Sequence, residues 1–167
     1  MKPQHRFALK LSKENITLLF TDFKGEERVI GSSDPNRPTL TNDLKGLLSQ
    51  LKALTDDYPI VDVQLPNDLI LCQSVPVDNP LTQADATDFI SRACDLRKHE
   101  VMVSVSEVYQ QKTQSIAAVT SKTITETRTF LRSAGFYTRN FIATAPVSGF
   151  RNRPTFAEDT VPWNYKA

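Results

Sequence analysis

Residues 7–65 read FALKLSKENITLLFTDFKGEERVIGSSDPNRPTLTNDLKGLLSQLKALTDDYPIVDVQL, and the spacing of the hydrophobic side chains changes twice within this stretch. Apolar and polar residues alternate over 6–11 and again over 16–20, and a short third strand is predicted at 27–30. A period of two is typical of half-buried strands, and polar turns of a few residues separate the three runs. The sequence therefore predicts an antiparallel meander, which is followed by a loop at 31–38.

A stripe of leucines at helical spacing comes next. It comprises Leu44, Leu47, Leu48, Leu51 and Leu54. Leucines three and four positions apart share one face of a helix, so the stripe predicts a helix whose apolar face is buried. Thr41, Asn42 or Asp43 is available to cap the N-terminus of this helix. The apolar run at 60–65 then predicts a strand, which completes an order of three strands, a helix and a fourth strand.

Beyond residue 66 the sequence again alternates between strand and helix patterns. Strands are predicted at 69–75, 101–105, 115–120 and 141–145, where apolar residues form short runs or alternate with polar ones. Two helices are predicted between these strands. The second half of the chain therefore continues the mixed α/β pattern of the first half.

Each of these two helices carries a recognisable start signal. Thr82 begins the first one, and Asp85 three residues later gives a variant of the capping box. Ser121 or Thr123 is expected to cap the second, and Gly135 to end it. The residues expected on the buried side of the first helix are Ala86, Phe89, Ile90, Ala93 and Leu96. Those expected on the buried side of the second are Ile124, Phe130, Leu131 and Ala134.

The composition narrows the function classes. The chain has 167 residues, of which 40% are hydrophobic and 23% charged, as expected for one globular domain or two small subdomains that share a core. Its 5 glycines argue against a glycine-rich phosphate loop, and its net charge of +1 argues against a nucleic-acid-binding protein. The polar N-terminus and the lack of a run of about 18 apolar residues predict a soluble, cytoplasmic chain without a membrane span.

The cysteines and histidines do not form a recognisable site. Cys72 and Cys94 are predicted to be buried free thiols in a reducing compartment, because a free cysteine behaves as a small hydrophobic residue. A reactive thiol is the alternative, but no histidine or basic cluster stands beside either cysteine to lower its pKa. His5 and His99 have no second histidine or cysteine at the spacing of metal ligands, so no zinc site is expected.

Carboxylates and arginines give no stronger signal. Two-metal chemistry on a ribonuclease-H-like sheet would need acidic residues at matching strand ends, and Asp22 and Asp62 have no such acidic neighbours. No Gly-x-Ser-x-Gly elbow and no nucleotide-binding glycine motif occurs. The scattered arginines predict a solvated face rather than a nucleic-acid surface; they are Arg128, Arg132, Arg139, Arg151 and Arg153. We therefore predict no catalytic, cofactor-binding or metal-binding residue.

Turn-forming residues dominate the sequence from Pro146 onward, although aromatic residues recur there. The aromatic side chains are Phe150, Phe156, Trp163 and Tyr165. Residues 148–167 are predicted to form an extended tail or linker. Three alternatives stay open for its aromatic residues: they dock on the surface of the chain itself, they lie in a disordered tail, or they contact a partner.

Three stretches carry a resemblance to a known family. They are the hairpin Phe7–Asp22, the strand–Pro–strand passage Val61–Pro66 with Leu69–Pro76, and the passage from Ile116–Thr120 to Leu131–Phe136. Across residues 6–147 the chain resembles the N-terminal half of an actin-like ATPase-fold protein of the PilM type, from type IV pilus assembly. It is also similar to the cytoplasmic domain of the type II secretion protein GspL.

The chain departs from this family at the first phosphate loop. Family members that bind ATP carry Asp-x-Gly on the first hairpin, whereas the matching turn here, Lys10–Glu14, has neither Asp nor Gly. Without glycine, backbone N–H groups cannot approach a phosphate as closely. The second phosphate loop and the adenosine pocket would belong to a second half beyond Ala167. The resemblance therefore implies a platform, and a degenerate nucleotide-binding domain is the alternative.

The predicted fold class is α/β: an actin-like (ribonuclease-H-like) half domain with an inserted small α+β subdomain. The expected limits are 1–147 for the actin-like domain, about 67–113 for the inserted subdomain and 148–167 for the tail. The resemblance implies a non-catalytic scaffold without cofactors at the inner face of the inner membrane. Its expected partners are proteins of a membrane-associated assembly machine and, as a homodimer, a second copy, but not nucleic acid.

Overall fold

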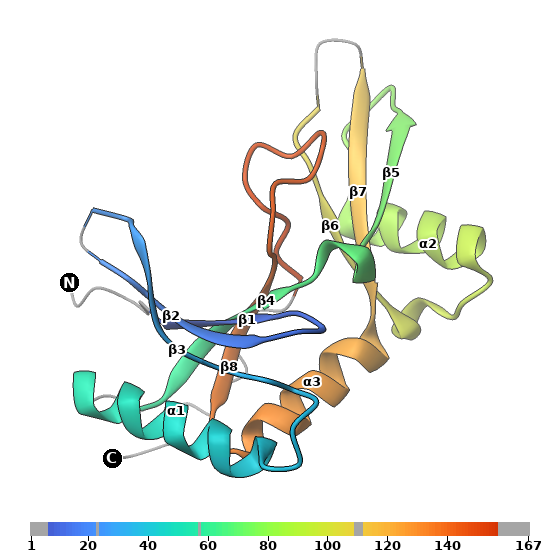
Figure 1. The fold of residues 1–167 in the computed structure, drawn as a ribbon. Coiled ribbons are helices and arrows are strands. Elements are labelled where there is room, and N and C mark those ends of the chain that lie inside the picture. Colours follow the sequence, from blue (N-terminus) through green and yellow to red (C-terminus); the bar gives the residue numbers. More distant parts are fainter. Residues whose placement is uncertain (1–6, 23, 57, 109–111, 157–167) are drawn as a thin grey trace.

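The computed structural model describes residues 7–22, 24–56, 58–108 and 112–156, which form two β-sheets with helices packed against them (Figure 1). The larger sheet has five strands in the order β3-β2-β1-β4-β8. Its strands are β1 (Phe7–Leu11), β2 (Ile16–Thr21), β3 (Glu27–Ser33), β4 (Ile60–Leu65) and β8 (Tyr137–Ala143). The predicted meander and the fourth strand after the first helix are confirmed.

Strand β4 lies between two parallel neighbours. It pairs in parallel with β1 and with β8, whereas β1, β2 and β3 pair antiparallel to one another. Parallel neighbours cannot be joined by a tight turn and need a crossover connection. The two crossovers carry helices α1 (Leu40–Leu54) and α3 (Ser121–Ser133), which lie on the same side of the sheet (Figure 1).

The main hydrophobic core lies between this sheet and these helices. Strand β4 is fully buried at Val61, Val63 and Leu65. Other fully buried members of the same core are Leu9, Leu18, Leu44, Leu51, Leu131, Phe136 and Phe141. Full burial of such a side chain stabilises the fold by about 1.5–3 kcal/mol. The leucine stripe thus fixes α1 through burial more than through helix propensity.

The leucine stripe is buried over most of its length, as predicted. Leu44, Leu47 and Leu51 face the core, and Leu48 is half-buried beside Gly135 at the end of α3. Leu54, in the last turn, is 60% exposed and does not belong to the core. The stripe therefore extends beyond the area that the sheet covers.

Two of the three predicted helix starts are wrong. Helix α1 begins directly after Thr39, whose side chain caps no N–H group, and Leu40 packs against the main core. Burial of Leu40 thus places the start upstream of the expected cap at 41–43. Helix α3 is capped by Thr120, whose hydroxyl accepts from the Thr123 N–H at 3.2 Å, because the strand before α3 runs directly into it.

The smaller sheet has the order β5-β7-β6 and carries its own helix. The bounds of these elements are β5 (Leu71–Pro76), α2 (Gln83–Cys94), β6 (Val101–Val105) and β7 (Thr113–Thr120), with short 3₁₀ turns at Asn67–Leu69 and Lys98–Glu100. The predicted capping box of α2 is present, with Thr82 and Asp85 bonded to each other's backbone N–H. A second hydrophobic cluster, which includes Ala86, Ile90 and Ile116, lies between α2 and the sheet.

Three side chains that were expected to be buried on the helices are exposed. Phe89 and Ala93 of α2 and Phe130 of α3 are accessible to solvent. Each flanks a buried stripe. Helix α2 packs chiefly over β6, so the small sheet covers only the central stripe of the helix. Helical spacing identified the correct face but overestimated its width.

Several strand limits also differ from the prediction. Strand β3 continues to Ser33, into the predicted loop at 31–38, after a bulge opposite Leu18 and Leu19. The strand expected at 69–75 begins only at Leu71, because residues 67–69 form a 3₁₀ turn after Pro66. The last strand, β8, spans 137–143 rather than 141–145, since it starts as soon as Gly135 ends α3 with a φ of 96°.

Residues 144–156, here called the post-β8 segment, fold back onto the chain. Phe156 joins the main core and is only 8% exposed, and its N–H donates to the Phe141 carbonyl of β8 at 2.8 Å. Gly149, with a φ of 87°, lies so close to Ser115 of β7 that a Cβ atom would clash with it. For the described part of the tail, docking on the chain itself is therefore correct; Trp163 and Tyr165 lie outside the described residues.

The α/β fold class with a small inserted α+β unit is confirmed. The expected domain limits at 67–113 and at residue 147 stay predictions. Strand β7, which is central to the smaller sheet, lies at 113–120. No helix in the described ranges is long and apolar enough to cross a membrane.

The leucine stripe of α1 gives a stability prediction. Leu51→Ala should lower the free energy of unfolding by about 2–5 kcal/mol, because it leaves a cavity at a fully buried position. Leu54→Ala is the matched control on the same helix and should change it by less than about 0.5 kcal/mol. Urea denaturation of the two variants measures both values. Equal effects would show that α1 does not bury the predicted face.

Candidate interaction surface

The turn between β1 and β2 is the segment in which the sequence resemblance leads us to look for a phosphate loop. The Ser12 hydroxyl accepts hydrogen bonds from the N–H groups of Glu14 at 3.3 Å and Asn15 at 2.9 Å. The Asn36 amide donates to the Lys13 carbonyl at 3.1 Å. Two backbone donors that could face an anion are thus satisfied within the turn, and no glycine allows a closer approach.

Asp22, one of the two carboxylates considered for two-metal chemistry, stabilises the turn between β2 and β3. Its Oδ1 accepts from the N–H of Lys24 at 2.8 Å and of Glu26 at 3.0 Å, and Arg28 forms an ion pair at 3.2 Å. The hydrogen bond from Glu26, followed by that from Lys24 and the charge of Arg28, lowers the pKa of this carboxyl despite some desolvation. These contacts make Asp22 a turn-stabilising residue.

Asp62, the other carboxylate considered for two-metal chemistry, lies on β4, away from that turn. Its Oδ1 accepts from the Asn140 N–H at 3.3 Å, where the register of β4 and β8 shifts. The structure therefore does not bring Asp22 and Asp62 together. Within the described ranges, no group of three or more histidine, cysteine or acidic residues is placed to hold a metal ion.

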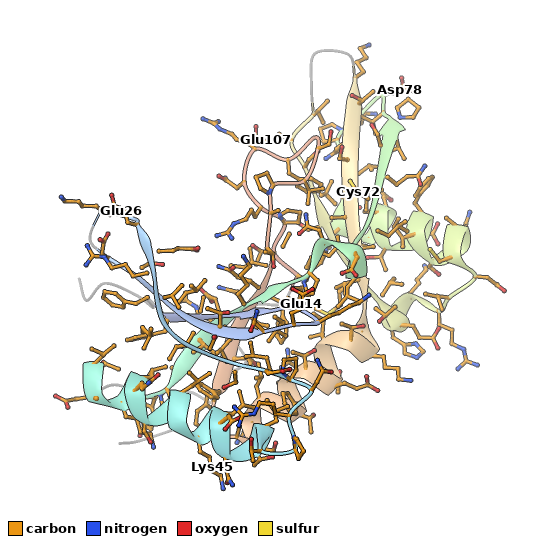
Figure 2. All side chains as sticks on the ribbon, viewed as in Figure 1. Glu14, Glu26, Lys45, Cys72, Asp78 and Glu107 are labelled. Atoms are coloured by element: carbon orange, nitrogen blue, oxygen red, sulfur yellow. The ribbon has the colours of Figure 1, made fainter. Side chains whose placement is uncertain are left out.

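The prediction of buried thiols is wrong for both cysteines. Cys94 is exposed at the end of α2, and Cys72 is exposed on β5, which forms an edge of its sheet (Figure 2). The Cys72 thiol lies 3.9 Å from the Ser148 carbonyl, and partial desolvation raises its pKa. The apolar run that contains Cys72 predicts burial of its thiol. Because β5 lies at the edge of its sheet, only one neighbouring strand covers this residue. His99 is also exposed, and His5 lies outside the described residues.

Three of the five arginines singled out in the sequence contact other side chains of the chain. Arg128 lies over the Phe141 ring at 5.7 Å and Arg132 over the Tyr137 ring at 4.9 Å, so both pack on β8. Arg153 forms an ion pair with Glu27 at 3.8 Å. Arg128 and Arg132 are thus stacked on aromatic rings of β8, and Arg153 is paired with a carboxylate.

A shallow polar cavity lies between the end of β3 and the start of α1. Its volume is about 360 Å³, and Ser32, Asp34, Arg37 and Asn42 are among its lining residues. The lining combines both charges with neutral amides and hydroxyls. It therefore does not select one class of ligand.

At two of the four sheet edges, some backbone groups are bonded within the chain. The post-β8 segment pairs with β8: Thr155 bridges Ile142, and the Ala143 N–H donates to the Pro154 carbonyl at 3.1 Å. At β6, Gln83 of α2 donates its side-chain amide to the Val103 carbonyl at 2.6 Å. These contacts satisfy backbone groups that would otherwise be open to another strand.

The other two edges, β3 and β5, differ in charge. Strand β3 begins with Glu27 and Arg28 and contains the bulge, and both features discourage pairing with another chain. Strand β5 has no charged residue anywhere in 69–77. Among the described residues, only β7 forms hydrogen bonds with its backbone. Leu69, in the 3₁₀ turn before β5, is 48% exposed, and Leu71, the first residue of β5, is 44% exposed. The open edge of β5 is therefore the candidate interaction surface.

The sequence prediction did not identify this surface. The sequence predicts a strand at 69–75 with a buried Cys72, and the absence of charge over 69–77 is the signal that points to the open edge. Which strands lie at an edge follows from the pairing order, and that order is set by contacts between distant segments.

No family model and no curated protein matches this chain, but several solved structures match it. The cytoplasmic domain of EpsL, an inner membrane component of the type II secretion system of Vibrio cholerae, matches with a TM-score of 0.55 and 15% identity over 81% of this chain and 55% of that chain. A PilM–PilN type IV pilus biogenesis complex matches with a TM-score of 0.57 and 17% identity, over 81% of this chain and 46% of that chain.

A looser match is a Bacteroides thetaiotaomicron protein with an actin-like ATPase fold and unknown function. Its TM-score is 0.45, with 12% identity over 92% of this chain and 70% of that chain. The chain spans about half the length of the EpsL and PilM structures that it resembles. The predicted resemblance to PilM-type and GspL-type proteins is confirmed at the level of the fold.

The turn at Asp22 predicts a pH-dependent contribution to stability. Because folding lowers the pKa of Asp22, its ionised form stabilises the native state above the ordinary aspartate pKa, and this stability is lost as pH falls through the lowered value. Asp22→Asn should therefore lower the melting temperature at pH 7, and the difference should shrink toward about pH 3. Glu14→Gln, at an exposed carboxylate, controls for net charge. A difference independent of pH would contradict this role.

The docked post-β8 segment gives a separate prediction. Phe156→Ala should lower the free energy of unfolding by about 3 kcal/mol, because it removes a ring from the main core. Phe130→Ala, which truncates a ring that is 39% exposed, should have a clearly smaller effect. Guanidinium unfolding compares the two. If Phe156→Ala has the smaller effect, the segment does not stabilise the fold.

Proposed function

We propose that this chain is a non-catalytic scaffold of a membrane-associated assembly machine, of the kind that builds type IV pili or type II secretion systems. The carrying observation is the fold that it shares with the EpsL cytoplasmic domain and with PilM in complex with PilN. One fold can serve several functions, so the residues themselves must also support a scaffold role. In the β1–β2 turn, two backbone N–H groups bond to the Ser12 hydroxyl, and no group of three or more acidic, histidine or cysteine residues in the described ranges is placed to hold a metal ion.

The proposed mechanism is contact through sheet edges and helix faces. Two rigid cores hold the exposed edge of β5 and the exposed side chains of α2 and α3 in fixed positions. By analogy with the PilM–PilN complex, the partner is another protein component of the same machine. We place this function at the cytoplasmic face of the inner membrane, where the EpsL domain belongs to an inner membrane component.

The scaffold proposal predicts that nucleotide does not bind. In the β1–β2 turn, the N–H groups of Glu14 and Asn15 are directed to the Ser12 hydroxyl and not outward. Calorimetric titration of the full chain with Mg-ATP should give only the heat of dilution measured in buffer. Binding at micromolar concentration would overturn the non-catalytic reading and support a degenerate nucleotide-binding domain.

The partner class requires a separate experiment. The tagged full chain, expressed in its native organism and purified from detergent-solubilised membranes, should retain components of a pilus or secretion machine that mass spectrometry identifies. An unrelated tagged protein from the same cells controls for background. Recovery of neither kind of component above background would overturn the assignment to an assembly machine.

A further inference from the structure

The sequence of β5 indicates which strand could pair with its open edge. An edge strand presents unpaired N–H and C=O groups that another strand can bind, and proteins usually protect such edges with charge, bulges or covering segments. Here the end of β8 is bonded to the post-β8 segment, β6 accepts a hydrogen bond from Gln83, and β3 is charged and bulged. Strand β5 has neither charge nor bulge, and only Pro76, its last residue, lacks an N–H group. We propose that β5 pairs antiparallel with β5 of a second copy, which joins two three-stranded sheets into one sheet of six strands.

The sequence of β5 matches itself in an antiparallel arrangement. When Gln73 of each copy lies opposite Gln73 of the other, Leu71 faces Val75 and Cys72 faces Ser74. Apolar side chains thus meet apolar ones, and small polarizable or polar ones meet each other. The glutamine amide carries both donors and an acceptor, so the two central side chains are able to bond to each other. No like charges meet across the pair.

The geometry of β5 supports this register. Leu71, Gln73 and Val75 point to one face, because side chains two positions apart share a face, and they pair with Ala118, Ile116 and Gln114 of β7. Ile116, Ala118 and Val75 already belong to the second hydrophobic cluster. Pairing would place Val75 of the second copy beside the exposed Leu71. The two second clusters would then form one continuous apolar layer.

The edge of β3 is a poorer candidate for self-pairing. Its Glu27 carboxylate accepts from the Gln64 amide at 3.0 Å and pairs with Arg153, so it is fixed within the chain. The Gly31 backbone lies against Gln50 and Leu47 of α1. Val29 is exposed on this strand and offers a matched control position. This inference goes beyond the proposed function, because self-pairing and membership of an assembly machine are able to fail independently.

Charges introduced at the centre of the pair test the proposal. In Gln73→Lys and Gln73→Glu, like charges would meet across the two-fold axis and weaken self-association by roughly fivefold or more in dissociation constant. A mixture of the two variants should restore it, because opposite charges then face each other. Val29→Lys is the control at the other edge and should leave association unchanged. Sedimentation velocity over a range of concentrations measures the wild-type chain, the three variants and the mixture, and circular dichroism shows whether each variant is folded.

Each outcome supports or overturns pairing through β5. A concentration-dependent dimer, weakened by each Gln73 variant and restored in their mixture, supports pairing through β5. A wild-type chain that stays monomeric to millimolar concentration overturns the proposal and leaves the edge to an extended segment of another protein. A dimer that Val29→Lys weakens and the Gln73 variants do not also overturns it, because β3 is then the contact.

Discussion

The structure depends on one constraint: β4 is held between two parallel strands. Parallel neighbours require crossover connections, and each crossover here brings a helix to the same face of the larger sheet (Figure 1). The leucines of α1 and the apolar residues of α3 then bury β4 at Val61, Val63 and Leu65. The whole smaller sheet lies within the second crossover, between β4 and β8. The inserted unit is thus attached at the most constrained part of the fold.

Strand β7 links the two hydrophobic cores. Alternate side chains of β7 point to opposite faces, and both faces are buried: Ala117 and Val119 belong to the main core, whereas Ile116 and Ala118 belong to the second cluster. The strand then leads without a loop into α3, whose first turn Thr120 caps. Close packing on both sides of one strand resists relative motion of the two sheets. The two sheets are therefore joined through the residues that β7 contributes to both cores.

The sequence predicted what local chemistry determines. The meander, the leucine helix and the Thr82–Asp85 capping box depend on spacing and on neighbours a few residues apart, and all three are confirmed. The sequence-based prediction was wrong where contacts between distant segments determine which side chains are exposed. The exposure of Cys72 and Phe89 depends on how far the small sheet extends, which no local pattern encodes. For the same reason the open edge of β5 was not predicted, although the uncharged run that characterises it was visible.

The polar contacts of Glu27 join distant segments of the larger sheet. The amide of Gln64, a buried residue of β4, donates to Glu27 of β3, and Arg153 of the post-β8 segment pairs with the same carboxylate. An exposed ion pair alone contributes about 0–1 kcal/mol, but a buried amide without a partner would cost about 1–3 kcal/mol. Glu27 thus satisfies Gln64 and ties three distant segments together. With one face covered by helices and these polar groups already engaged, edge strands are the part of the sheets whose backbone groups are still available for recognition.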